Sequence, residues 1–98
     1  RINPLDTNSL RGELLFIDGE DEAQVSWAIQ KHKVEKEEHK PKIILIKGAP
    51  FDLSERLALP IYFDQSGHLT KKLGISQVPA CVFQKNKVLA IEEIELKP

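Results

Sequence analysis

The segment Gly74-Ile75-Ser76-Gln77-Val78-Pro79-Ala80-Cys81-Val82-Phe83-Gln84-Lys85-Asn86-Lys87-Val88 says more about the fold than any other part of the chain. Gly74 can end a helix, because glycine readily adopts the left-handed conformation that follows a last helical turn. A Val-Pro step then leads into an apolar stretch, and Asn86 accepts the positive φ that tight hairpin turns require. This segment therefore predicts a two-turn helix that ends at Gly74 and an antiparallel hairpin of strands at 80–85 and 88–94.

Two further apolar runs precede this segment. Leu14–Ile17 and Ile43–Ile46 are continuously apolar, which is typical of strands buried on both faces of a sheet. Between them a helix is predicted over 22–38, with Asp21 as its N-cap and Pro41 beyond its end. A strand, a helix and a strand of these lengths form a right-handed crossover with parallel strands.

The remaining segments carry weaker signals. Residues 1–13 are turn-rich and are predicted to be a surface lead-in to a single domain at 14–98. Between the second strand and the last helix we expect a single helical turn at 53–57 and a short extended piece at 61–63. The helix at 22–38 has apolar residues on two nearly opposite faces, whereas a helix that lies on a sheet usually has one.

Composition argues against several classes of function. The 98 residues suit one small domain, and 14 basic against 15 acidic residues give a net charge of −1. Without a basic excess, and with one Trp, one Tyr and four Phe, the chain has little support for nucleic-acid binding. No apolar run approaches the roughly 20 residues of a membrane-spanning helix. One cysteine cannot form an internal disulfide. The chain shows no signal peptide, and we expect a fragment or a processed product.

The order of predicted elements, β-α-β followed by α-β-β, resembles the core of the thioredoxin fold, and residues 67–94 match its second half in kind and spacing. In that family the proline before the hairpin is normally cis, and a Cys-x-x-Cys motif follows the first strand. Here that position reads Asp18-Gly19-Glu20-Asp21-Glu22, so the resemblance implies the scaffold without the redox chemistry. The expected fold is an α/β, thioredoxin-like domain with a mixed sheet. It should lack the usual C-terminal helix, because the chain stops four residues after the last predicted strand.

A narrower resemblance is carried by short motifs along nearly the whole chain. They are Arg1-Ile2-Asn3-Pro4-Leu5, Phe16-Ile17-Asp18-Gly19-Glu20-Asp21, Gln24-Val25, Trp27-Ala28, Tyr62-Phe63-Asp64-Gln65, Gly67, Leu69, Gly74-Ile75 and Val78-Pro79-Ala80. In this order and spacing they resemble the C-terminal domain of the TraW family of F-type conjugative transfer systems. The resemblance implies a periplasmic protein of a type IV secretion apparatus that assembles the conjugative pilus, with TrbC-like and TraU-like proteins as partners. A fusion of TrbC-like and TraW-like domains in one chain is a related interpretation.

Two parts of the chain are candidate partner-binding sites. In thioredoxin-like proteins the loop corresponding to Val78-Pro79-Ala80 lies beside the redox site and contacts bound peptide through its backbone, so the resemblance implies a peptide-docking edge. Alternatively, Pro79 only fixes the turn into a strand. Trp27 is the second candidate, because the missing C-terminal helix would leave a slot beside it and tryptophan is enriched at interfaces. Alternatively, residues 1–13 fold over Trp27 and cover it.

No catalytic, cofactor or metal site is predicted. Cys81 is expected to pack in the core as a small hydrophobe, and the acidic turn at 18–22 to cap a helix, with selection of a basic partner as a weaker hypothesis. His32 and His39 are seven residues apart, too far for an i, i+4 metal pair, and His68 opens another helix. We therefore expect a non-catalytic binding domain. The alternatives are a divergent thiol-disulfide oxidoreductase or chaperone-like domain that uses Cys81 alone, and a domain that only stabilises a longer chain.

Overall fold

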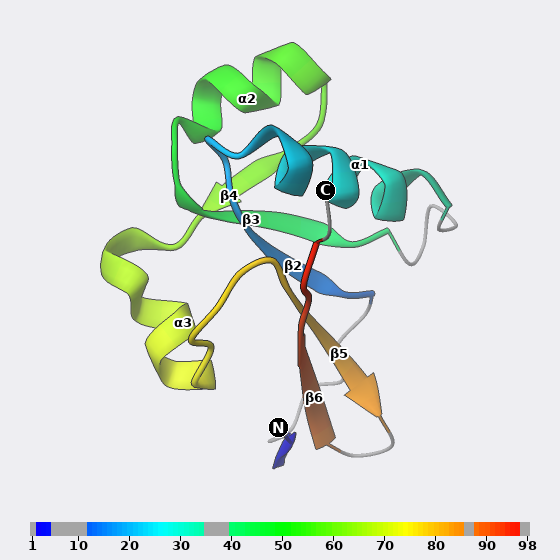
Figure 1. Ribbon diagram of the computed structural model, residues 1–98, viewed down its shortest axis with the longest axis vertical. Coiled ribbons are helices and arrows are strands. Elements are labelled where there is room, and N and C mark those ends of the chain that lie inside the picture. Colours follow the sequence, from blue (N-terminus) through cyan, green and yellow to red (C-terminus); the bar gives the residue numbers. More distant parts are fainter. Residues whose placement is uncertain (1, 5–11, 35–39, 86–87, 97–98) are drawn as a thin grey trace.

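A computed structural model describes residues 2–4, 12–34, 40–85 and 88–96, which form a six-stranded mixed sheet with helices on both faces (Figure 1). The strands are β1 (Ile2–Pro4), β2 (Leu14–Asp18), β3 (Lys42–Lys47), β4 (Ile61–Phe63), β5 (Ala80–Lys85) and β6 (Val88–Glu93). The helices are α1 (Glu22–Val34), α2 (Pro50–Leu57) and α3 (His68–Leu73), with the 3-10 turn η2 (Gln65–Gly67) before α3.

The sheet has the strand order β1-β6-β5-β2-β3-β4. β2 pairs in parallel with β3, and β3 in parallel with β4, so the predicted crossover through α1 is confirmed. β5 pairs antiparallel with both β2 and β6, which confirms the predicted hairpin. This mixed α/β architecture is compatible with a thioredoxin-like arrangement, as predicted.

The sheet divides the apolar core into two layers. The layer under α1 and α2 contains Leu15, Ile17, Val25, Ala28, Ile43, Leu45, Leu53 and Cys81. The layer on the opposite face contains Phe16, Ile44, Ala80 and Val82, with Leu73 and Ile75 among the half-buried residues that pack on it. Alternate residues of β2 and β3 supply both layers, which is why each strand appears in the sequence as an unbroken apolar run.

Helix α3 begins and ends as the sequence predicts. Asp64 lies just before the first turn, and its carboxylate accepts the N–H groups of Leu69 at 2.7 Å and Thr70 at 3.0 Å. Gly74 has φ 73° and ends the helix in the left-handed region. The helix is therefore fixed by polar groups at both ends, although none of its side chains is fully buried.

Three segments have more regular secondary structure than the sequence predicted. The supposed lead-in contains β1, which pairs antiparallel with β6, so the description of residues 1–13 as only a lead-in is corrected. The expected single turn at 53–57 is a full helix, α2, which starts at Pro50 and packs Leu53 and Leu57 against the core. The extended piece at 61–63 is a sheet strand, β4. β1 and β4 have three residues each, too few for local sequence to specify a strand. Pairing with a neighbouring strand stabilises their extended conformation.

The two apolar faces that the sequence shows on the first helix have different surroundings. Val25 and Ala28 are buried, Trp27 is half-buried, and Val34 is 76% exposed. One face of α1 therefore contacts the sheet. Residues 35–38 of the predicted helix lie outside the described residues, as does the turn residue Asn86.

The residues that follow β6, 94–96, are not helical. None of the described helices is long and apolar enough to cross a membrane.

Candidate binding pocket at the start of helix α1

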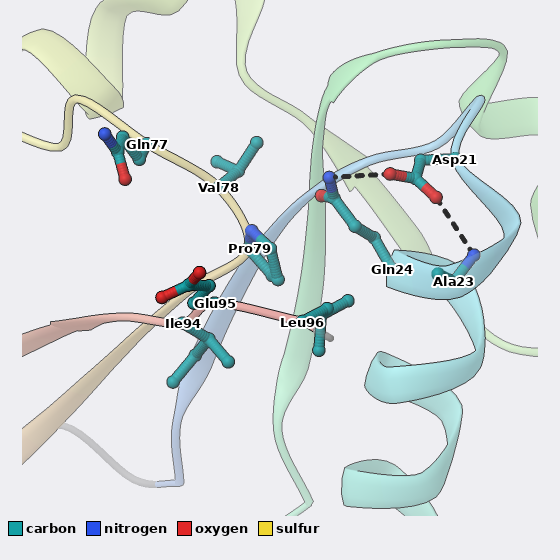
Figure 2. Close-up of a pocket in the computed structure, with 9 residues that line it drawn as sticks. All are labelled: Asp21, Ala23, Gln24, Gln77, Val78, Pro79, Ile94, Glu95 and Leu96. Atoms are coloured by element: carbon teal, nitrogen blue, oxygen red, sulfur yellow. Dashed lines mark hydrogen bonds between the residues drawn. The ribbon is translucent and has the colours of Figure 1, made fainter. Parts of the chain in front are cut away.

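A pocket of about 450 Å³ lies where three segments meet: the start of α1, the loop before β5 and the segment after β6 (Figure 2). Its lining residues are Asp21, Ala23, Gln24, Gln77, Val78, Pro79, Ile94, Glu95 and Leu96. These segments are far apart in the sequence, so only the folded sheet brings them together.

The α1 wall is built by the acidic turn. The Asp21 carboxylate accepts the Ala23 N–H at 3.0 Å, which confirms Asp21 as the N-cap, and it also accepts the Gln24 side-chain amide at 3.1 Å. The Gln24 side-chain oxygen in turn accepts the Asp18 N–H at 2.8 Å. In Figure 2 the Gln24 side chain extends from the first turn of α1 toward the loop that carries Pro79. Helix cap and pocket wall therefore share the same residues.

Gly19 lets the acidic turn approach β3 closely. Its N–H donates to the Lys47 carbonyl at 2.9 Å. A Cβ at this position would lie 2.8 Å from both that oxygen and a methyl group of Leu45, closer than real Cβ contacts allow. Glycine is therefore required here for a steric reason, and the close approach fixes the start of α1 on the sheet.

The loop wall is held by a single carboxylate. One oxygen of Glu93, on β6, accepts the Ser76 N–H at 2.8 Å, the Ser76 hydroxyl at 3.0 Å and the Gln77 N–H at 3.0 Å. The Ser76 N–H, the Gln77 N–H and the Ser76 hydroxyl lower the pKa of Glu93, because each stabilises the ionised carboxylate. The loop then enters β5 through a cis peptide bond between Val78 and Pro79.

The third wall continues the sheet. The Ile94 N–H donates to the Pro79 carbonyl at 2.8 Å, one residue beyond the end of β6. Ile94 and Leu96 then present apolar side chains to the pocket, with Glu95 between them. The lining therefore combines the apolar side chains of Val78, Pro79, Ile94 and Leu96 with the carboxylates of Asp21 and Glu95.

The pocket contains no thiol, and the lone cysteine lies elsewhere. Cys81 is 1% exposed within the core layer under α1. Burial, followed by the nearby Glu13 carboxylate, raises the pKa of the Cys81 thiol to about 12. A thiol with such a pKa is almost entirely protonated at neutral pH and is a poor nucleophile. Among the described residues, no group of three or more His, Cys, Asp or Glu could hold a metal ion.

Comparison with known proteins identifies a relative of this chain. The chain is 41% identical over 81 residues to Protein TraW of Escherichia coli (strain K12), and the match covers 83% of the chain. The chain is related to TraW. The TraW resemblance predicted from the short motifs is thereby supported. The match covers 37% of that protein, so the chain spans little more than a third of its relative's length. No protein-family model and no solved structure matches the chain.

The structure separates the predicted partner-binding residues. Val78 and Pro79 line the pocket. Ala80 is 0% exposed in the opposite core layer, so its side chain is not available to a partner. Trp27 does not line this pocket. It packs against the core layer under α1, with the Lys31 ammonium 5.7 Å from its ring centroid.

The alternative interpretation of Trp27 has residues 1–13 cover it. Leu5 and Leu10, the apolar residues of that segment that would do so, lie outside the described residues. The partner-binding roles of Trp27 and of the Pro79 loop therefore stay predictions.

Sequence reasoning missed Glu93, Gln24 and the segment 94–96 as parts of this site. Gln24 could have been found, because Asp21 and Gln24 have the spacing of a helix N-cap with a polar residue three positions later. Glu93 could not, because its partners are 16 and 17 residues away in sequence. Ile94 and Leu96 give no local signal and join the site only because β6 runs toward α1.

Proposed function

We propose that this chain is a non-catalytic protein-binding domain that acts in the periplasm, in the assembly of conjugative pili. The relation to TraW supports the involvement in conjugative transfer, and the same relation makes other proteins of the transfer system the expected partners. TrbC-like and TraU-like proteins are the first candidates. Since the chain spans a little over a third of its relative, the proposal concerns the part played by this domain.

The chemistry of the pocket is the observation that carries the proposal. In redox-active relatives of this fold, the start of the first helix holds the reactive thiols. Here the same position holds Asp21 and Gln24, which hydrogen bond to each other and to the backbone. Cys81 is buried, and its pKa is raised to about 12. These features support binding over thiol chemistry, because neither carboxylates nor a buried thiol can attack a disulfide.

The pocket also offers what an extended peptide needs. Within the described part of the chain, no hydrogen bond reaches the backbone N–H or C=O of Val78. Those groups can pair with a peptide that lies along the loop, in the manner of an added strand. Pro79, Ile94 and Leu96 supply an apolar floor for its side chains. Asp21 and Glu95 favour a partner segment with basic residues.

A binding experiment with matched variants tests this proposal. The 98-residue chain serves as bait for purified TrbC-like and TraU-like proteins of the same transfer system. We expect a specific complex whose affinity falls at least about tenfold in Leu96→Asp, since a carboxylate would be buried in an apolar contact. Val34→Asp is the control, because Val34 is 76% exposed at the far end of α1. A complex that tolerates Leu96→Asp as well as it tolerates the control would contradict the proposed pocket.

The Trp27 prediction is tested in the same assay. Trp27→Ala should lose more than about 1 kcal/mol of partner binding if Trp27 is an interface hot spot. Full affinity in a folded Trp27→Ala variant would assign the residue to the core alone.

A thiol probe tests the non-catalytic part of the proposal. We expect Cys81 in the native protein to react far more slowly than in the protein unfolded with denaturant. Rapid native labelling, together with disulfide reductase activity that Cys81→Ser abolishes, would establish the thiol-disulfide oxidoreductase instead.

A further inference from the structure

The end of the sheet opposite β1 has an unpaired edge. β4 is the last strand in the order and pairs with β3 on one side, while no described strand pairs with its other side (Figure 1). The Asp64 N–H donates to the Leu45 carbonyl at 2.9 Å, toward β3. Successive residues of a strand direct their backbone groups to alternate edges, so the N–H and C=O of Phe63 and Ile61 point away from the sheet.

The side chains at this edge are aromatic and accessible. Tyr62 is 46% exposed, Phe63 38% and Leu69, in the first turn of α3, also 38%. These are three of the five large apolar side chains that the described residues expose. An edge strand with such side chains is a template for another strand, and natural proteins normally protect such edges.

The titratable residues that line two hollows beside β4 are mostly basic, as far as the described residues show. The hollow on the α3 side is lined by Phe63 and Leu69 together with His68, Lys71 and Lys72. A second hollow, beside the start of β4, is lined by Tyr62 together with His32, Lys40 and Lys42. The Lys42 ammonium lies 5.8 Å from the centroid of the Tyr62 ring.

Within the described residues, no acidic side chain forms an ion pair with Lys42, Lys71 or Lys72. Asp64 is the one acidic residue that lines either hollow, and its carboxylate is already engaged by Leu69 and Thr70. The ion pairs between described residues use Lys31, Lys47 and Arg56, not Lys42, Lys71 or Lys72. The charge complement of this edge is therefore acidic.

We propose that the outer edge of β4 binds an extended acidic segment of a partner protein as an additional strand of the sheet. The outward N–H and C=O groups of Ile61 and Phe63 pair with the segment's backbone, as in other cases of strand addition. Apolar side chains of the segment contact Tyr62, Phe63 and Leu69, and its carboxylates lie near Lys42, Lys71 and Lys72. This site is separate from the pocket beside Pro79 and prefers the opposite charge.

Two other occupants fit less well. A second copy of the chain, paired β4 to β4 about a two-fold axis, would bring the same lysines together, and like charges facing each other are destabilising. A nucleic acid would satisfy the lysines, but its backbone has no alternating N–H and C=O groups to pair with Phe63 and Ile61.

A fluorescent peptide is the first probe. It is an eight-residue peptide of alternating valine and glutamate, titrated into the 98-residue chain and followed by anisotropy. We expect saturable binding, weakened at least about tenfold when lysine replaces glutamate. N-methylation of alternate amides of the peptide should abolish binding, because it removes the donors that strand pairing needs. Equal binding of the acidic and basic peptides, or unchanged binding of the N-methylated one, would overturn the proposal.

Protein variants then locate the site. Lys71→Glu with Lys72→Glu should weaken binding at least about tenfold, and Lys33→Glu, an exposed lysine on α1, is the matched control. Phe63→Pro removes an outward N–H while leaving the β3 pairing intact, so binding should be lost in a folded protein. Leu96→Asp should leave this binding unchanged, which keeps the test independent of the Pro79 pocket. Unchanged binding in the double lysine variant, or full competition by single-stranded DNA of the same charge, would overturn the proposal.

Discussion

Asp64 and Glu93 perform the same task in opposite surroundings. Each is a carboxylate that accepts backbone N–H groups from a neighbouring segment, and in each the pKa is lowered. Asp64 is 2% exposed and holds the start of α3. Glu93 is exposed and holds the loop at Ser76 and Gln77, next to the candidate pocket.

This difference in burial indicates that Asp64 stabilises the whole domain, whereas Glu93 mainly orders the loop beside the pocket. A buried carboxylate whose partners are removed leaves polar groups without water, so its loss is felt by the whole domain. An exposed carboxylate can be replaced by water, so its loss is felt mainly as local disorder. The start of α3 should therefore be rigid, whereas the wall of the pocket should adjust.

The largest effect expected from this comparison is that of Asp64→Ala. The variant loses the acceptor for the N–H groups of Leu69 and Thr70. We expect its free energy of unfolding to be about 1–2 kcal/mol lower than that of the wild type. Urea denaturation measures this loss. Asp64→Asn, which keeps one acceptor oxygen, should lose less, and Gln65→Ala should be nearly neutral. Equal stability of Asp64→Ala and Gln65→Ala would remove the distinction between the two carboxylates.

A second effect is the loss of stability in acid. Burial raises the pKa of Asp64, but the N–H groups of Leu69 and Thr70, the Thr70 hydroxyl and the nearby His68 together outweigh it, so the folded-state pKa lies below the unfolded one. The same sign holds for Glu93. Both carboxylates therefore stabilise the fold above their unfolded pKa values, about 4, and this stability is lost as pH falls through the folded values.

Urea midpoints at a series of pH values below about 6 test this sign. The decline toward acid should be shallower in Asp64→Asn than in the wild type, and only slightly shallower in Glu93→Gln. The reverse ranking would mean that the exposed carboxylate contributes more than the buried one.

Glu93→Gln should act on the loop more than on the fold. It removes the charge from three hydrogen bonds, so the amides of Ser76 and Gln77 should exchange with solvent faster. Hydrogen exchange followed by NMR measures this directly. Glu92→Gln, one residue earlier on β6, is the matched control. Unchanged exchange at both amides would show that Pro79 alone holds the loop.

The smallest effect is expected from Ser76→Ala. This change deletes the hydroxyl hydrogen bond to Glu93 and keeps both backbone bonds. We expect global stability to be unchanged within error and exchange at Gln77 to rise less than in Glu93→Gln. A larger rise in exchange than in Glu93→Gln would show that the Ser76 hydroxyl, and not the Glu93 charge, orders the loop.

Much of the framework followed from local sequence. The apolar runs at 14–17 and 43–46 gave β2 and β3, and Gly74 gave the end of α3. Asp21 gave the start of α1. In each case the signal is written in a few adjacent residues, as a run, a cap or a left-handed glycine. β1 was not predicted, and 61–63 was predicted only as an extended piece, because three residues without a pattern become a strand only beside an existing edge.

By itself, the sequence determined the strands that are buried on both faces, the helix caps and the absence of a Cys-x-x-Cys motif after the first strand. It also carried the relation to TraW. Only the tertiary structure decided what surrounds the pocket, because Asp21, Pro79 and Leu96 meet through the order of the strands. The burial of Cys81 was predicted from the sequence, whereas only the tertiary structure buried Ala80 and left Tyr62 and Phe63 exposed. At the edge of the sheet and beside the pocket, burial depends on which elements cover a strand.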